Sequence, residues 1–365
     1  MSFIIDKQTF NDLEIPGKKG KRSIQSLFSF TKTRGGSELL DEIFQYPLTS
    51  ADVLTKRIEV FKFFQEHKLE FPISVINLDM VDQYLRNSDE RTILVLKKKT
   101  PVDHLKDFFQ PNSQIQNQIA AVKAVISIGH ELSAFLDKIA KKAWVSAYHD
   151  AYKELKELRL VIPDLKIVSR DQLSELDRHF RFEKREQLTR LLNLIYLLDV
   201  NITVANVAIA NEFTFPVISD KPEAVLEITG LKHPLLSSAV PNNIAVMSEK
   251  NLFLLTGVNM AGKSTFMKSF GIAVFLAHIG FPVPASRMVL SVFDGLLTTI
   301  NLSDNLGIGH SHFYAEVVRM RKMAEYLNKG KRMVLIVDEI FRGTNVVSYG
   351  DVDHPVPGQI DHWVS

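Results

Sequence analysis

The chain has no cysteine among its 365 residues. It can therefore form neither disulfides nor thiolate metal sites, which fits a reducing compartment. It also lacks an excess of charge of either sign, because 44 Lys and Arg residues oppose 42 Asp and Glu residues and leave a net charge of +2. The sequence as a whole thus gives no basic signal for nucleic acid, and any contact with DNA has to be local.

Long hydrophobic runs are also missing. The longest apolar stretch, residues 272–283, is interrupted by His278, Gly280 and Pro282 and is too short to span a bilayer. The first seven residues contain no apolar core of a signal peptide. We therefore expect a soluble cytoplasmic protein without a membrane partner, and the length allows two or three domains.

One stretch in the second half of the chain is typical of a phosphate-binding (Walker A) loop. It reads Gly257-Val258-Asn259-Met260-Ala261-Gly262-Lys263-Ser264 and is followed by Thr265. An apolar run at 252–256 predicts a strand before it, and the residues after it predict a helix. Glycines let backbone N–H groups converge on an anion, and the helix directs its positive end to the same place. Lys263 would reach the β- and γ-phosphates of ATP, and Ser264 would bind Mg²⁺. A chance match on an ordinary strand–helix turn is the alternative.

A pair of acids follows the apolar run 333–337, which predicts a central parallel strand buried on both faces. Asp338 could help to hold Mg²⁺ beside the loop. Glu339 could orient or deprotonate the attacking water. Alone, the pair could be a solvated strand end; together with the loop it indicates an ATPase.

A third motif, residues 309–313, opens a predicted helix that runs to about Leu327. Ser311 could simply cap this helix. Alternatively it faces the γ-phosphate held by a second subunit, which would make catalysis depend on dimerisation. His310 and His312 have no carboxylates at metal-site spacing and are interpreted as loop polarity.

The first half of the chain reads as helical. Leu54, Ile58 and Phe61 form one apolar stripe at i, i+4 and i+7. Two long tracts follow, one at about 113–160 with a possible interruption near Gly129, and one from a capping-box sequence at 169–172 to about 213. Their short connection favours an antiparallel pair. Their mixed charges predict a solvated face, with a DNA-facing stripe as the alternative.

The predicted fold class is α + α/β. It comprises an all-α core at residues 1–100, long antiparallel lever helices at 101–215, and a P-loop α/β ATPase domain similar to ABC ATPases at 216–365.

The motifs together resemble the MutS family of mismatch-repair ATPases. The segment 256–265 looks like its Thr-Gly-Pro-Asn-Met-Gly-Gly-Lys-Ser-Thr loop, and 338–344 is similar to its Asp-Glu-hydrophobic-x-Arg-Gly-Thr segment. Further similarity covers 303–316, the His-Pro element at 233–236, the helix 196–213 and the core start at 31–48. The resemblance implies that residues 257–265 bind the triphosphate of ATP, with Asn259 near the γ-phosphate. It also implies that Asp338 holds Mg²⁺, Glu339 activates water and Ser311 completes the site of a partner subunit.

The chain departs from the family pattern in several places. The mismatch-reading and connector domains are not recognisable before the core, and the connection at 161–168 leaves no room for a DNA clamp. Ala239 and Val240 occupy the place where the family tends to have an adenine-stacking aromatic. After Thr344 the match stops, neither His354 nor His362 replaces the family's switch histidine, and we expect the ATPase domain to be incomplete at its C-terminus.

Three functions are compared on this basis. The first is a reduced MutS-like DNA-binding ATPase that works as a homodimer or with a related subunit and takes part in mismatch repair or a related process. The second is a truncated, non-hydrolysing nucleotide-binding fragment or interaction module. The third, a chromosome-maintenance ATPase, is disfavoured because the chain has Ser311-His312-Phe313 where that group has Leu-Ser-Gly-Gly.

Overall fold

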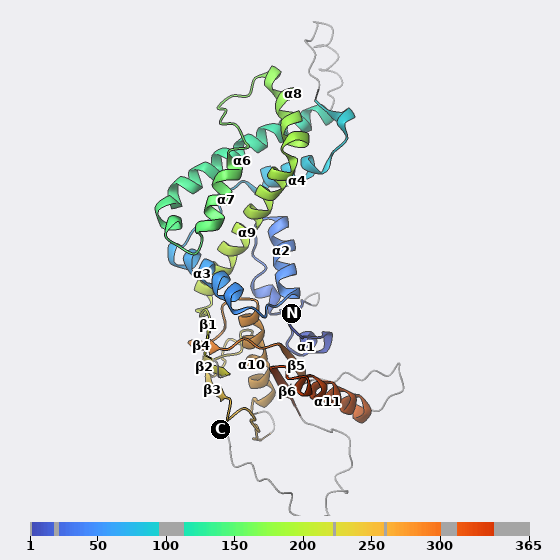
Figure 1. The fold of residues 1–365 in the computed structure, drawn as a ribbon, viewed down its shortest axis with the longest axis vertical. Helices are drawn as coiled ribbons and strands as arrows, with labels where there is room; N and C mark the ends of the chain where they lie inside the picture. The colour runs from blue at the N-terminus through green and yellow to red at the C-terminus, as the bar shows by residue number, and fades with distance from the viewer. Residues whose placement is uncertain are drawn as a thin grey trace, which may run out of the picture. The chain divides into compact units, whose positions relative to one another are not determined.

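The computed structural model describes residues 2–17, 22–94, 113–221, 224–258, 261–300 and 312–338. An N-terminal helical region is followed by a mixed α/β region, which confirms this part of the predicted fold class (Figure 1). The chain forms two compact units. They are an α/β unit of Met1–Ser29, Asp41–Ile58 and Asn206–Ser365, and a helical unit of Phe30–Leu40 and Glu59–Ala205.

The first residues of the chain are thus grouped with the α/β region. The division into core, lever helices and ATPase domain at residues 1–100, 101–215 and 216–365 remains a prediction about functional parts. The boundary between the two units falls inside three helices, which are α2 (Arg34–Gln45), α3 (Ala51–His67) and α9 (Arg185–Ala210).

The other helices of the helical unit are α4 (Val75–Arg86), α6 (Ser113–Trp144), α7 (His149–Arg159) and α8 (Arg170–Arg178). A 3₁₀ turn covers Glu90–Thr92, and a π-helical turn covers His179–Glu183. α6 packs against α4, α7 and α8. The predicted stripe on α3 is confirmed, since Leu54, Ile58 and Phe61 are all buried.

The predicted interruption near Gly129 is wrong. α6 runs through this position, and the break comes after Trp144, before α7 turns back against α6. Gly129 serves close packing instead: Arg159 Nε donates to its carbonyl at 2.6 Å, and an added Cβ would lie 2.9 Å from Ile162. The second tract starts with the predicted capping box at Ser169 but is divided into α8, the π turn and α9.

Among the described residues, the helices α6 and α9 are long and apolar enough to cross a membrane. However, 56% and 67% of their most apolar windows are buried inside the fold. Buried helices that are apolar all round are usual in the cores of soluble proteins. The burial therefore favours core helices over membrane spans.

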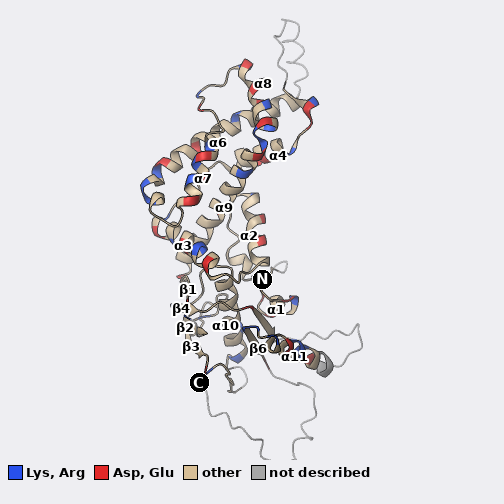
Figure 2. Cartoon of the chain, in the orientation of Figure 1, with Lys and Arg blue, Asp and Glu red and all other residues tan. Residues whose placement is uncertain are grey.

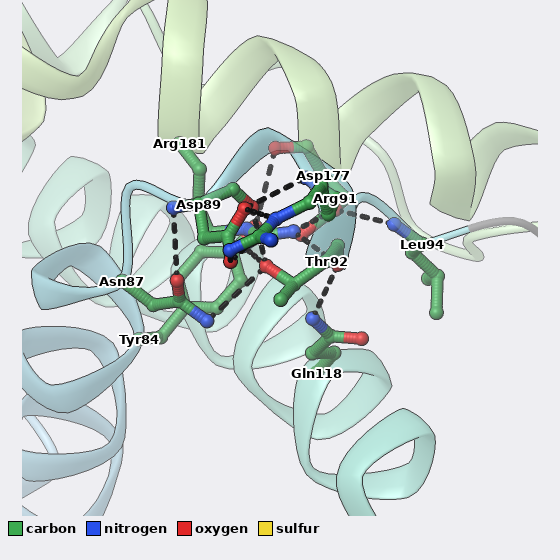
Figure 3. A network of polar contacts seen from close by, with 9 residues as sticks. All are labelled: Tyr84, Asn87, Asp89, Arg91, Thr92, Leu94, Gln118, Asp177 and Arg181. Carbon is green, nitrogen blue, oxygen red and sulfur yellow. Dashed lines mark hydrogen bonds and ion pairs between the residues drawn. The ribbon is translucent and has the colours of Figure 1, made fainter.

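A buried ion pair joins Asp177 of α8 to Arg181 of the π turn (Figure 3). The side chains of Asp177 and Arg181 are both 0% exposed, and Arg181 donates to Asp177 through Nε at 2.8 Å and Nη2 at 2.5 Å. Asp177 also accepts from Tyr84 Oη at 2.7 Å and Leu94 N at 2.8 Å, and Arg181 Nη1 donates to Thr92 at 2.8 Å. Burial, together with the Asp177 charge, raises the pKa of Tyr84 well above its usual value.

The α/β unit contains two sheets. A four-stranded sheet has the order β1 (Val217–Ile218), β4 (Arg287–Leu290), β2 (Val225–Leu231), β3 (Asn242–Met247). In it, β1 is parallel to β4, whereas β2 is antiparallel to both β3 and β4. The second sheet consists of β5 (Gly295–Thr299) and β6 (Met333–Val337), which are parallel with Leu297 opposite Leu335. The helices of this unit include α1 (Lys7–Asp12), α10 (Lys263–His278) and α11 (His312–Asn328).

The predicted strand β6 is confirmed at 333–337, and the predicted helix α11 is confirmed with its end one residue beyond Leu327. The prediction for the burial of β6 is wrong, because Val334 and Ile336 are buried while the alternate residues are half-buried. β5 is instead the strand that is buried throughout. The segment 252–256 is not a strand apart from one bridge position at Leu254. Strands form by pairing rather than by apolar content alone, and the side chains of Leu252 and Leu254 are exposed.

Candidate functional site

The glycine loop leads directly into α10. Gly262 is the N-cap of this helix and has a φ of +93°, a left-handed conformation that favours glycine. Its carbonyl accepts the first helical hydrogen bond, from Phe266 N at 2.9 Å. Gly262 has no side chain, so the N-cap residue itself offers no acceptor to the first N–H groups of α10. Such helix starts attract anions because the N–H groups and the helix dipole point outwards.

Lys263 folds back over the loop. Its ammonium group donates to Gly257 O at 2.7 Å and to Val258 O at 3.0 Å. An ammonium group has three N–H donors, so these two carbonyls leave one donor for an anion. The lysine is therefore held at the loop, at the end of α10 where an anion is favoured.

The loop meets the end of β6 through Ser264. The Ser264 hydroxyl donates to Asp338 Oδ2 at 2.5 Å, although the two residues are 74 positions apart. Asp338 is fixed in turn by β5, since its N–H donates to Thr299 O at 2.8 Å. The structure thus brings together the loop serine and the aspartate that follows the apolar strand. Their assignment to a metal remains a prediction.

Four of the predicted site residues lie outside the described part of the chain. They are Asn259, Met260, Ser311 and Glu339. The others are described, and Gly257, Val258, Ala261, Gly262, Lys263, Ser264 and Thr265 all lie on the loop or the first turn of α10. Where the chain is described, no group of three or more His, Asp or Glu side chains is arranged to hold a metal. The Ser264–Asp338 pair supplies two oxygen atoms of the kind that Mg²⁺ prefers.

The His-Pro element lines a cleft of about 360 Å³. Arg22, Lys232 and His233 are among its lining residues. Burial lowers the pKa of His233, Glu14 opposes this shift, and Lys268 adds to it. His233 Nδ1 accepts from Leu235 N at 3.3 Å, so the imidazole orders its own turn.

The N-terminal segment also contributes to this site, although no motif in the sequence indicates it. Asp12 and Thr9 on α1 accept hydrogen bonds from Thr298 on β5. Asp6 pairs with Arg319 of α11. Burial by itself would raise the pKa of Asp6, but hydrogen bonds from Arg319 and Thr9 outweigh it and lower the pKa to about 2. These contacts join residues about 290 to 310 positions apart, and no local pattern indicates them.

The charged residues of the helical unit do not separate by sign. Figure 2 shows Lys and Arg mixed with Asp and Glu along α7 and α8. Several of them form exposed pairs, such as Lys153 with Glu157 and Arg190 with Glu154. Mixed pairs of this kind suit a solvated surface. The mixed charges of α7 and α8 therefore favour the solvated face over the DNA-facing stripe.

A known family model covers the segment that holds the candidate site. The family model described as MutS domain V matches residues 253–351, which include the loop, α10, β5, α11, β6 and Asp338. Residues 259–260, 301–311 and 339–351 within this match lie outside the described part.

Several curated relatives are DNA mismatch repair proteins MutS. The protein of Carboxydothermus hydrogenoformans is 34% identical over 219 residues, 56% of this chain and 25% of the relative. The Lactobacillus helveticus protein is 30% identical over 258 residues, 68% of this chain and 29% of the relative. The Thermotoga neapolitana protein is 29% identical over 326 residues, 80% of this chain and 39% of the relative. The chain thus spans between a quarter and two fifths of these relatives.

The loop, the Ser264–Asp338 contact and the family match all lie in the same part of the α/β unit. The chain belongs to the MutS family through its domain V ATPase region, with homology to the DNA mismatch repair protein MutS over part of its length.

Proposed function

We propose that this protein is a MutS-like, DNA-binding ATPase that acts in DNA mismatch repair or a related DNA-maintenance process. ATP binding and hydrolysis would drive the rearrangement of a dimer on DNA, and the protein would work in the cytoplasm. The observation that carries this proposal is the hydrogen bond from Ser264 to Asp338, because it joins the phosphate loop to the acid at the end of β6. The relatives named MutS support the DNA-repair part of the proposal.

The site residues have separate roles in this proposal. The backbone N–H groups of the loop and of the first turn of α10 bind the phosphates, Lys263 neutralises their charge, and Asn259 contacts the γ-phosphate. Glu339 orients the attacking water and accepts its proton. Ser311 would face the γ-phosphate of the partner subunit, so that hydrolysis requires two chains.

Mg²⁺ fits this site. The hydroxyl of Ser264 and the carboxylate of Asp338 are hard oxygen ligands that already lie within contact distance, at 2.5 Å. When bound, the ion would neutralise charge on the β- and γ-phosphates.

Nucleotide binding is the first test. Wild-type protein should bind ATP in the presence of Mg²⁺, as measured by isothermal titration calorimetry, and Lys263→Ala should lose most of this affinity. Lys153→Ala is a matched control, because Lys153 is an exposed lysine of α7 that pairs only with Glu157 among the described contacts. Absence of ATP binding by the wild type would rule out the proposal.

A second candidate is a nucleotide-binding protein that does not hydrolyse ATP. Single-turnover hydrolysis separates the two candidates. ATP cleavage that Glu339→Gln abolishes supports the enzyme, whereas tight binding without cleavage supports the alternative.

DNA binding is tested separately. We expect affinity for DNA that falls linearly with the logarithm of salt concentration, because phosphate contacts release counterions. Filter binding with homoduplex, mismatched and branched DNA would measure it. A preference for mismatched over homoduplex DNA would favour mismatch repair over the related DNA-maintenance processes. No measurable binding to any of the three would remove DNA from the proposal.

A further inference from the structure

The N-terminal segment of the chain pairs with the strand that supports the candidate site. Ile4 forms a parallel bridge with Gly295 at the start of β5, with Ile4 N donating to Asp294 O at 2.8 Å and Leu296 N donating to Ile4 O at 2.9 Å. A Cβ on Gly295 would lie 2.4 Å from Ile4 O, so only glycine allows this approach. β5 thus has β6 along one edge and the N-terminal segment along the other.

Asp12 then contacts the opposite end of β5. Its Oδ2 accepts from Thr298 Oγ1 at 2.7 Å and from Ile300 N at 3.0 Å, and Asp12 is only 1% exposed. Thr9 Oγ1 accepts from Thr298 N at 3.0 Å. Alternate backbone groups of a strand point to opposite edges. Asp12 therefore accepts a hydrogen bond from a backbone N–H group on one edge at the end of β5. On the other edge, Thr299 O accepts from Asp338 N.

The same segment also packs on the helix that carries the loop lysine and serine. An added Cβ on Gly271 of α10 would lie 2.7 Å from Leu13 Cδ2 and 3.0 Å from Ile336 Cδ1 of β6. Leu13 is 0% exposed, and the rings of Phe10 and Phe275 meet edge to face at 5.7 Å. The N-terminal segment thus packs against both α10 and β5, which are the two elements that position Ser264 and Asp338.

From this geometry we infer that Asp12 is a positioning residue for the nucleotide site. Its carboxylate fixes the end of β5 through Thr298 and Ile300, Thr299 fixes the backbone of Asp338, and Asp338 accepts from Ser264. The role assigned to Asp12 is therefore indirect, because it acts on Asp338 through β5. The inference rests on the proposed function, because it assigns Asp12 to the site at which Mg²⁺ and ATP would bind.

The test compares ATP binding with Mg²⁺ and with EDTA, measured by calorimetry on the full chain. Replacing a residue hydrogen-bonded to a metal ligand typically lowers metal affinity by about 10- to 100-fold. Because Asp12 acts on Asp338 through β5 and not by a direct hydrogen bond, Asp12→Ala should raise the Mg²⁺ concentration needed for half-maximal ATP binding by about 10-fold, the lower end of that range, with little change in the affinity measured in EDTA. Asp12→Asn should keep most of the wild-type behaviour, because the amide oxygen can still accept from Thr298 and Ile300. Asn11→Ala is the matched control, since Asn11 is the exposed neighbour on the same helix.

Coupling to Asp338 distinguishes positioning from a general effect on stability. In an Asp338→Asn background, Asp12→Ala should cause no further rise in the Mg²⁺ concentration needed for half-maximal ATP binding. The effects of two substitutions are not additive when one residue acts through the other. If Asp12→Ala does not fold, Thr298→Val removes one of the two hydrogen bonds without opening a large cavity, and it should shift the Mg²⁺ dependence in the same direction.

Two results would overturn the inference. Unchanged Mg²⁺ dependence in a folded Asp12→Ala or Thr298→Val protein would do so while leaving the proposed function intact. Equal losses of ATP affinity in Mg²⁺ and in EDTA would also overturn it. If the wild type binds no ATP at all, the proposed function and the inference fail together.

Discussion

A single histidine at the end of α10 should make the stability of this protein depend on pH. His278 is 0% exposed, its Nδ1 lies 2.8 Å from Val274 O, and its Nε2 accepts from Phe293 N at 3.0 Å. The ring can satisfy both contacts only as the neutral form with its proton on Nδ1. Burial lowers the pKa of His278 from 6.5 to about 4, an effect that the contact with Val274 opposes only in part.

The sign of the effect follows from proton uptake. Between pH 6.5 and about 4 the unfolded chain binds a proton at His278 and the folded chain does not, so the free energy of unfolding falls as the pH is lowered through this range. The loss attributable to this residue is about 3 kcal/mol, and its contribution is fully present above pH 6.5. Urea unfolding at pH 7, 6, 5 and 4 would measure it. In His278→Gln this part of the slope should disappear; identical slopes in both proteins would contradict the assignment.

At the scale of elements, the buried pair of Asp177 and Arg181 should hold α8 and the π turn on the helical unit. Arg181→Met leaves the Asp177 carboxylate buried without its cation, and breaking such a pair typically costs about 3–5 kcal/mol. Arg178→Met is the control, because Arg178 is 69% exposed and lies 3.7 Å from an exposed Glu183. The control should change the free energy of unfolding by less than about 0.5 kcal/mol. Equal effects of the two substitutions in urea unfolding would show that burial of the pair does not matter.

Elements with a local cause could be predicted from the sequence. The capping box at Ser169 starts a helix because its two hydrogen bonds lie within four residues. Gly262 marks the loop because only a residue tolerant of positive φ suits that turn. The apolar run that becomes β6 could be recognised from its local composition, although its pairing with β5 could not.

Elements that depend on distant partners could not be predicted. The apolar segment 252–256 looks like a strand, yet whether it becomes one depends on a neighbour for pairing. Gly129 looked like a helix breaker, but glycine is required there because Arg159 of α7 and Ile162 of the turn after α7 approach α6 closely. The contact between Asp12 and Thr298 spans 286 positions, so the most unexpected part of the candidate site had no local signal.

At the scale of the whole molecule, three continuous helices link the two compact units. The unit boundary falls inside α2, α3 and α9, so neither unit can unfold completely without breaking helices that belong partly to the other. Helix formation is cooperative along the chain. We therefore expect the two units to unfold in one transition, and a ligand of the α/β unit to stabilise the helical unit as well.

Mg²⁺-ATP provides the test of this coupling. A ligand at 100 times its Kd stabilises the folded state by about 2.7 kcal/mol, and the gain should be visible to a probe in either unit. Trp144 reports on the helical unit, because its ring meets His149 edge to face at 4.6 Å; Trp363→Phe removes the other tryptophan. In that variant, Trp144 fluorescence and far-UV circular dichroism should show the same rise in Tm with Mg²⁺-ATP, and Lys263→Ala should abolish it for both probes. If Mg²⁺-ATP raised the Tm measured by circular dichroism but left the Tm measured by Trp144 fluorescence unchanged, the helical unit would unfold independently. The ligand would then stabilise only the unit that binds it.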